Sequence, residues 1–174
     1  MSGSLIKINE AIVTSSVASV SLLGIDSTYD VYMVKVNNWK TDTNDRQCLA
    51  RVTESGTPNT TANYDYAGKG LRSDTTFTNR SGTNGTEFKF EYIGTADSQA
   101  QSNLTLFLFN FNSTTEYAFI TNEMSNLDYL GNAFGTQGGQ VFTSTGTATD
   151  GIQFFMASSA NTSAGTFTLY GLKK

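Results

Sequence analysis

The sequence predicts an all-β fold, a single-domain β-sandwich that is jelly-roll-like and has eight to nine short antiparallel strands. Thr, Val, Phe and Tyr, which favour strands, are frequent, whereas strong helix formers are scarce. Short apolar runs with a period of two recur along the chain and are separated by Gly, Asn and Asp. With 174 residues, the chain is long enough to bury one core.

The first half divides into strands and one long loop. We expect residues 1–10 to be an N-terminal segment and residues 11–174 to be the β-sandwich domain. Strands are expected within Ala11–Leu23, Tyr29–Val36 and Cys48–Glu54, because alternate residues in each are apolar. Residues 55–85 have no convincing period, and we expect a long loop at about these positions.

The second half contains the most apolar strand. Phe88–Tyr92 alternates with charged residues, so one face of this strand is expected to meet water. Leu104–Phe111 is apolar on both faces, which predicts a central strand or one covered by a second subunit. Leu127–Gly139 is expected to be loop-rich, and Asp150-Gly151 to form a hairpin turn before the last strands. The shared period predicts these core residues: Tyr32, Val34, Val36, Ala50, Val52, Phe90, Leu106, Phe154, Phe167 and Leu169.

Composition excludes several kinds of chemistry. The chain has no His and one Cys, Cys48, which excludes the usual zinc sites, Ser-His pairs and an intramolecular disulfide. The net charge is −4 and no basic run is present, which argues against nucleic-acid binding. No segment approaches the ~20 apolar residues of a membrane-spanning helix, and no secretory signal is recognisable. We expect no cofactor.

Carboxylates leave two alternatives open. Glu87 with Glu91, or Glu116 with Glu123, could form a glycosidase-type acid/base pair, but solvated charges at strand edges are the favoured interpretation. Residues 42–45 have the oxygen density of a calcium loop without its Gly and distal Glu, so a plain turn is favoured and no metal site is expected.

Aromatic residues provide the candidate binding surface. Tyr is favoured at interfaces because its ring is large and rigid and its hydroxyl is polar. The loop candidates are Tyr64, Tyr66, Tyr129 and Phe134; the alternative is that these rings pack beneath their own loops. Phe107, Phe109 and Phe111 are expected near a subunit contact, unless the 55–85 loop covers that face within one chain.

Several stretches resemble a family of virion structural proteins of tailed bacteriophages. They are Ser27–Trp39, Cys48–Gly56, Asn63–Gly68, Leu106–Thr115, Asp150–Ser159 and Ala164–Lys173, and the last two form the most specific part. Where the family usually has a Pro after the strand in Leu106–Thr115, this chain has Phe111. The resemblance implies a jelly-roll-like β-sandwich that forms homo-oligomers on a phage particle. It brings no catalytic residues with it.

The function that follows is non-enzymatic. The first expectation is a capsid decoration or cement protein that stabilises or decorates the phage head. The alternative is a tail or fibre-tip protein that binds a host glycan or protein receptor through its loops. A carbohydrate-active enzyme is the third class. It is not favoured, because the chain has no recognisable acid/base pair. The expected partners are the chain itself, as a homotrimer by analogy with virion proteins, and the major capsid protein. The expected location is the virion, after assembly in the host cytoplasm.

Overall fold

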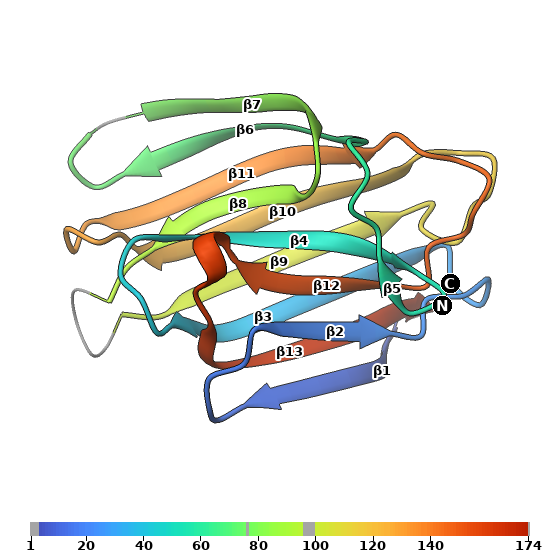
Figure 1. Cartoon of the computed structure of the whole chain (residues 1–174), viewed down its shortest axis with the longest axis horizontal. Helices are drawn as coiled ribbons and strands as arrows, with labels where there is room; N and C mark the ends of the chain where they lie inside the picture. Colours follow the sequence, from blue (N-terminus) through green and yellow to red (C-terminus); the bar gives the residue numbers. More distant parts are fainter. Residues whose placement is uncertain (1–3, 76, 96–99, 174) are drawn as a thin grey trace.

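A computed structural model describes residues 4–75, 77–95 and 100–173. Within these ranges the chain is all-β and forms two antiparallel sheets that pack face to face, as expected (Figure 1). No helix in this part of the chain is long and apolar enough to cross a membrane. The strands are β1 (Ser4–Val13), β2 (Ser19–Leu23), β3 (Val31–Thr41), β4 (Arg46–Glu54), β5 (Thr57–Pro58), β6 (Tyr64–Arg72), β7 (Phe77–Gly85), β8 (Phe88–Ile93), β9 (Ser102–Phe109), β10 (Ala118–Leu127), β11 (Ala133–Phe142), β12 (Gly151–Met156) and β13 (Thr162–Lys173).

Eight of these strands make a jelly roll. In the larger sheet β1, β13, β3 and β9 are neighbours, and in the smaller sheet β2, β12, β4 and β8 are neighbours. The chain passes between the two sheets at most of the connections among these strands, which is the arrangement of a jelly roll. The jelly-roll expectation is therefore confirmed, although the described residues form thirteen strands and not the eight to nine expected.

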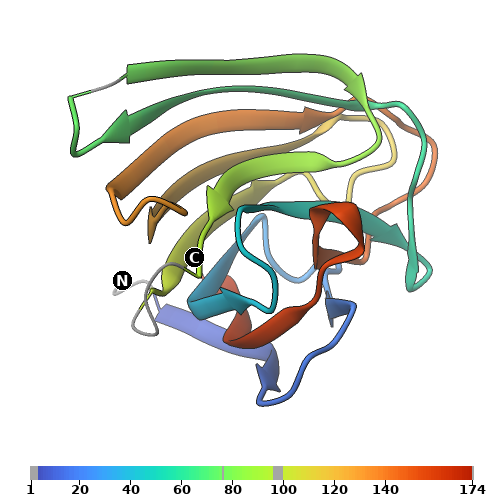
Figure 2. The ribbon, with the colours of Figure 1, turned by 60° about the vertical axis from the view of Figure 1, so that its left-hand side comes forward.

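Two hairpins enlarge one of the sheets. The pair β6–β7 is inserted between β4 and β8, and the pair β10–β11 is inserted between β9 and β12. β11 pairs with β6, so the larger sheet grows to eight strands in the order β1-β13-β3-β9-β10-β11-β6-β7. β6 and β7 extend beyond the smaller sheet, and β8 is the nearest strand in front of them (Figure 2).

The core lies between the sheets and follows the expected alternation. All ten predicted core positions are buried, each at most 2% exposed. Within the core the Trp39 ring makes edge-to-face contacts with Phe154 and Phe167 at 5.8 and 5.4 Å between ring centroids. The Trp39 indole N–H donates to the Thr162 hydroxyl at 3.0 Å, which satisfies its one polar atom inside the core.

Three expectations about segments are wrong. Most of the 1–10 segment belongs to β1, which pairs with β13 along the edge of the larger sheet. The 55–85 loop is instead β5 and the β6–β7 hairpin, and Leu127–Gly139 lies mostly in β10 and β11. These segments are paired through backbone hydrogen bonds with distant strands, and polar or glycine-rich strands carry little local signal of that pairing.

The Asp150-Gly151 pair does not form a hairpin turn. It joins β11 of the larger sheet to β12 of the smaller one, and neither residue has a positive φ. The Asp150 carboxylate accepts hydrogen bonds from the Thr53 hydroxyl at 2.6 Å and the Gly56 amide at 2.7 Å. Gly151 is required because a Cβ there would lie 2.3 Å from the carbonyl oxygen of Leu22.

Candidate functional site

The larger sheet has a face that points away from the smaller sheet, which we call the outer face. The strand register places an apolar row across it near one end of the strands, made by Val31, Phe109, Phe119 and Val141. Met33 and Phe107 extend this row by one step along their strands. Phe119 is 46% exposed and Phe107 is 37% exposed. This end of the outer face is therefore apolar, and its Phe107 and Phe119 side chains are open to solvent.

A polar row runs beside the apolar one. Lys35, Thr105, Glu123 and Gln137 lie opposite one another on β3, β9, β10 and β11. The Lys35 ammonium donates to the Thr105 hydroxyl at 2.8 Å, and the Gln137 amide donates to the Glu123 carboxylate at 3.2 Å. These contacts hold both charges over the sheet.

The polar row continues to both sides of the sheet. Glu10 on β1 lies opposite Thr168 of β13, which in turn lies opposite Lys35. At the other side, Gln137 lies opposite Lys69 of β6. The charges thus alternate along the row, acidic on β1, basic on β3, acidic on β10 and basic on β6.

A groove of about 730 Å³ lies on the outer face between β10 and β7. Ala67 and Gly139 form a floor without large side chains, and Phe119 and Thr83 stand on either side. The nearest atom to a Cβ built on Gly139 would be the Ile120 carbonyl oxygen, at 3.9 Å. The groove is thus open space above the glycine, and its walls are mainly apolar.

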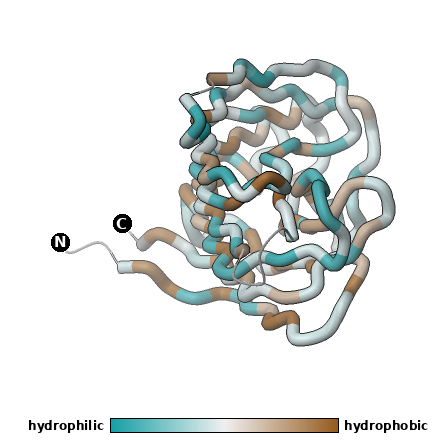
Figure 3. The backbone as a smooth tube through the Cα atoms, turned by 90° about the vertical axis from the view of Figure 1, so that its left-hand side faces the viewer, coloured by the Kyte–Doolittle hydropathy of each residue, from teal (hydrophilic) through white to brown (hydrophobic). Residues whose placement is uncertain are grey.

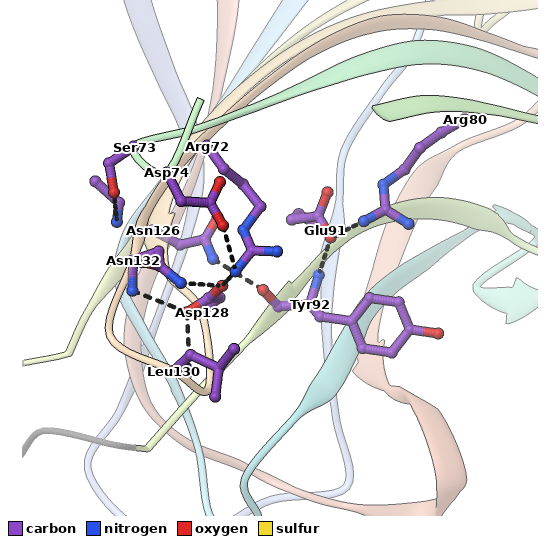
Figure 4. Close-up of polar contacts among 11 residues, drawn as sticks. Arg72, Ser73, Asp74, Arg80, Glu91, Tyr92, Asn126, Asp128, Leu130 and Asn132 are labelled. Atoms are coloured by element: carbon purple, nitrogen blue, oxygen red, sulfur yellow. Dashed lines mark hydrogen bonds and ion pairs between the residues drawn. The ribbon is translucent and has the colours of Figure 1, made fainter. Parts of the chain in front are cut away.

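The tip of the β10–β11 hairpin is held by one carboxylate (Figure 4). Asp128 accepts hydrogen bonds from the Leu130 and Asn132 amides, both at 2.9 Å, and pairs with Arg72 at 2.7 Å. Burial opposes the charged form of Asp128, but these hydrogen bonds and the Arg72 charge outweigh it and lower the pKa. Tyr129 lies at this tip and is exposed.

A second carboxylate is buried between β8 and the larger sheet. Glu91 is 1% exposed and pairs with Arg80 at 2.5 Å (Figure 4). Burial raises its pKa, against the opposing effects of the Tyr92 amide and the Arg80 charge. The interpretation of Glu91 as a solvated charge is therefore wrong. A β-bulge is the cause, because three residues of β8 span the distance that two residues of β4 cover, which turns Glu91 inward beside Phe90.

The predicted contact residues divide into two groups. Phe107 and Phe109 lie on the outer face, Tyr129 lies at the hairpin tip, and the half-buried Tyr66 lines the groove. By contrast, Tyr64, Phe111 and Phe134 are buried and offer no surface to a partner, so these three expectations are corrected.

Each of the buried rings has a local cause. Tyr64 stacks edge-on against Phe88 at 4.8 Å between centroids, and its hydroxyl donates to the Asn59 carbonyl at 2.7 Å. Phe134 occupies space left by Gly70, where a Cβ would lie 2.6 Å from its ring. Phe111 follows Asn110, whose φ of 59° ends the alternation of β9 and directs the next ring into the core.

The sequence reasoning missed several outer-face residues. Phe119, Val141 and Met33 belong to the apolar row, and Gly139 forms the groove floor. Phe119 follows the period of two in β10, where Ala118 and Ile120 are buried, so alternation in that strand could have identified it. Gly139 has no comparable signal, because a glycine in a polar segment indicates a turn.

The other acidic groups make structural contacts. Glu87 pairs with Arg51 at 3.3 Å and with Lys89 at 3.7 Å, so Glu87 and Glu91 have different cationic partners. Asp42 accepts hydrogen bonds from the backbone and side-chain amides of Asn161, and the backbone amide is the main cause of its lowered pKa. In the described ranges no group of three or more His, Cys, Asp or Glu residues could hold a metal ion.

Comparison with known proteins gives no relative: no family model, curated protein or solved structure matches this chain.

Proposed function

We propose that the chain is a non-enzymatic structural protein that works through contact surfaces, and that it decorates or cements the head of a tailed bacteriophage. The observation that carries the proposal is the apolar row of the outer face, in which large side chains are open to solvent on a rigid sheet. Contiguous exposed apolar surface on a folded protein usually marks a protein–protein contact. The phage particle is proposed because the sequence resembles phage virion proteins.

The extended jelly roll supports a structural role. Its sheets are tied together by an aromatic core and its polar side chains are largely engaged in contacts within the chain, such as Lys35 with Thr105. A protein that cements a shell must keep its shape under load, and close-packed interiors resist deformation. The groove of about 730 Å³ lies next to the apolar row rather than around a cluster of acid and base groups.

Electron microscopy tests this proposal directly. Particles made with and without the gene should differ by density on the head, and adding the purified chain back should restore it. Density on the tail instead, or no difference between the particles, would contradict a role at the head.

The hairpin tip favours a second candidate, a tail or fibre-tip protein that binds a host receptor. Tyr129 and Leu130 are exposed at a turn that Asp128 holds rigidly, which is how receptor-binding loops are often presented. Binding of the chain to host cells that is lost in Tyr129→Ser, with the fold unchanged, would support this candidate over the head protein.

A further inference from the structure

The paired ends of β1 and β13 form a projection at the edge of the larger sheet. They extend beyond the outer face, away from the smaller sheet (Figure 3). Leu5 and Ile6 in this projection are 50% and 40% exposed, so side chains on both sides of β1 are open to solvent here. Leu5 lies opposite Leu172 of β13. We call residues 4–7 with residues 170–172 the lip.

The lip and the groove lie at the same end of the strands, on opposite sides of β9. Two strands, β13 and β3, lie between β9 and β1 on one side, and two strands, β10 and β11, lie between β9 and β6 on the other. Across the sheet, the lip lies in line with the apolar row. At its other end this line of residues reaches Val141 and Asp65, which belong to the groove wall. An apolar projection and an apolar hollow are thus placed symmetrically about one strand.

The geometry points to a two-fold dimer in which the outer faces of two copies pack together, with the axis parallel to the strands and passing over β9. In this arrangement β9 faces β9 of the second copy, and β3 faces its β10. The next strands outward, β13 and β1, face β11 and β6 of the second copy. Each lip then enters the groove of the other subunit. Phe107 and Phe109 meet their own counterparts on the axis.

Charge selects this axis over the alternative. With the axis along the strands, Lys35 of one copy faces Glu123 of the other, and Glu10 faces Lys69, so both contacts join opposite charges. An axis across the strands would instead place each strand on itself, with Lys35 near Lys35 or the apolar row over polar side chains. The alternating row is self-complementary only in the first case.

The face is large enough for a stable dimer. The five strands centred on β9 are β13, β3, β9, β10 and β11. With a spacing of about 4.8 Å between strands and about ten residues of 3.4 Å along each, they give a face of roughly 800 Å², which is the area per partner of a standard interface. The inference rests on the outer face being a contact surface, as proposed above, and it specifies the partner as a second copy.

Reversing single charges tests the arrangement. We expect the wild-type chain to have twice the monomer mass of 18.8 kDa in light scattering. Lys35→Glu and Glu123→Lys should each weaken the dimer by about tenfold, because each variant places like charges together twice per homodimer. An equimolar mixture of the two variants should restore dimerisation, since the mixed dimer contains only opposite-charge contacts.

The mixture separates the dimer from effects within one chain. The two-fold arrangement is wrong if the mixture of the two variants dimerises as weakly as each variant alone. It is also wrong if the wild-type chain is a trimer or a monomer. These measurements use the purified chain alone. The dimer can therefore be absent while density on the phage head is still observed, and the dimer can be present while that density is absent.

Filling the groove provides an independent test. Gly139→Leu adds a side chain where only one atom lies within 4 Å, so the monomer should fold normally while the lip is excluded and dimerisation falls. Leu5→Ser in the lip should weaken the dimer similarly. Leu23→Ser, at a residue that is 38% exposed on the smaller sheet, is the matched control and should leave it unchanged. A full-strength dimer in Gly139→Leu would overturn the lip-in-groove contact.

Discussion

At the scale of single residues, two carboxylates, Glu91 and Asp128, have pKa values shifted in opposite directions. Glu91 is held in its charged form by Arg80 against the cost of burial, which raises its pKa. Asp128 has enough hydrogen bonds to lower its pKa despite partial burial. The pH dependence of stability should therefore separate the two.

Removing Arg80 should expose the cost of burying Glu91. We expect Arg80→Met to lower the free energy of unfolding by about 3 kcal/mol near neutral pH, because a buried charge loses its partner. Glu91 binds a proton more readily in the folded state than in the unfolded state, so this deficit should shrink as pH falls and Glu91 becomes neutral. Urea unfolding at several pH values measures it. A deficit that does not change with pH would contradict the assignment.

Asp128 should behave in the opposite way. Its lowered pKa stabilises the folded state at pH values above the ordinary Asp pKa of about 3.9, and this contribution is lost as pH falls through the lowered pKa. Asp128→Asn should therefore be less stable than wild type by about 1–2 kcal/mol near neutral pH, with the difference disappearing in acid. Equal stability at neutral pH would show that the hairpin tip does not depend on this charge.

At the scale of elements, one residue decides which way the end of β9 turns. Alternation from Leu104 onward predicted Phe107, Phe109 and Phe111 on one face, and two of the three lie there. Asn110 adopts a left-handed conformation that breaks the alternation before the third. An Asn tolerates this conformation, but nothing in the sequence requires it.

Substitutions at Asn110 test this turn. Asn110→Gly should leave stability within a few tenths of a kcal/mol, whereas Asn110→Val should cost about 1–2 kcal/mol because a β-branched residue is strained at positive φ. Thermal or urea unfolding of both variants measures the difference. If the two variants were equally stable, the left-handed conformation would not be what positions Phe111.

Glycines explain why the inserted hairpins were not predicted. The alternation in β3, β4, β12 and β13 is carried by large apolar side chains, and the core was predicted correctly there. In β6 and β11 the pattern is broken by Gly68 and Gly138, which lie opposite each other across the strand pair. A Cβ on Gly68 would lie 2.8 Å from the Gln137 carbonyl oxygen, so glycine permits close packing of two strands. Such a role is indistinguishable from a turn signal in one sequence.

At the scale of the whole molecule, the outer face is a product of the enlarged sheet. The jelly roll alone supplies β1, β13, β3 and β9, and the inserted hairpins add β10, β11, β6 and β7. The lip belongs to the first group of strands and the groove to the second. The position of Phe107 and Phe109 on the face opposite the core could be predicted because β9 is apolar on both faces, but the groove depends on pairing between β6 and β11 that no local pattern indicates.

The mass of the wild-type chain and of Phe109→Asp in solution tests most directly whether the outer face mediates self-association. Size-exclusion chromatography with light scattering at micromolar concentration should give a dimer for the wild type. It should give a folded monomer of 18.8 kDa for Phe109→Asp, because Phe109 lies outside the core. A monomeric wild type, or a Phe109→Asp variant that remains a dimer, would contradict the account.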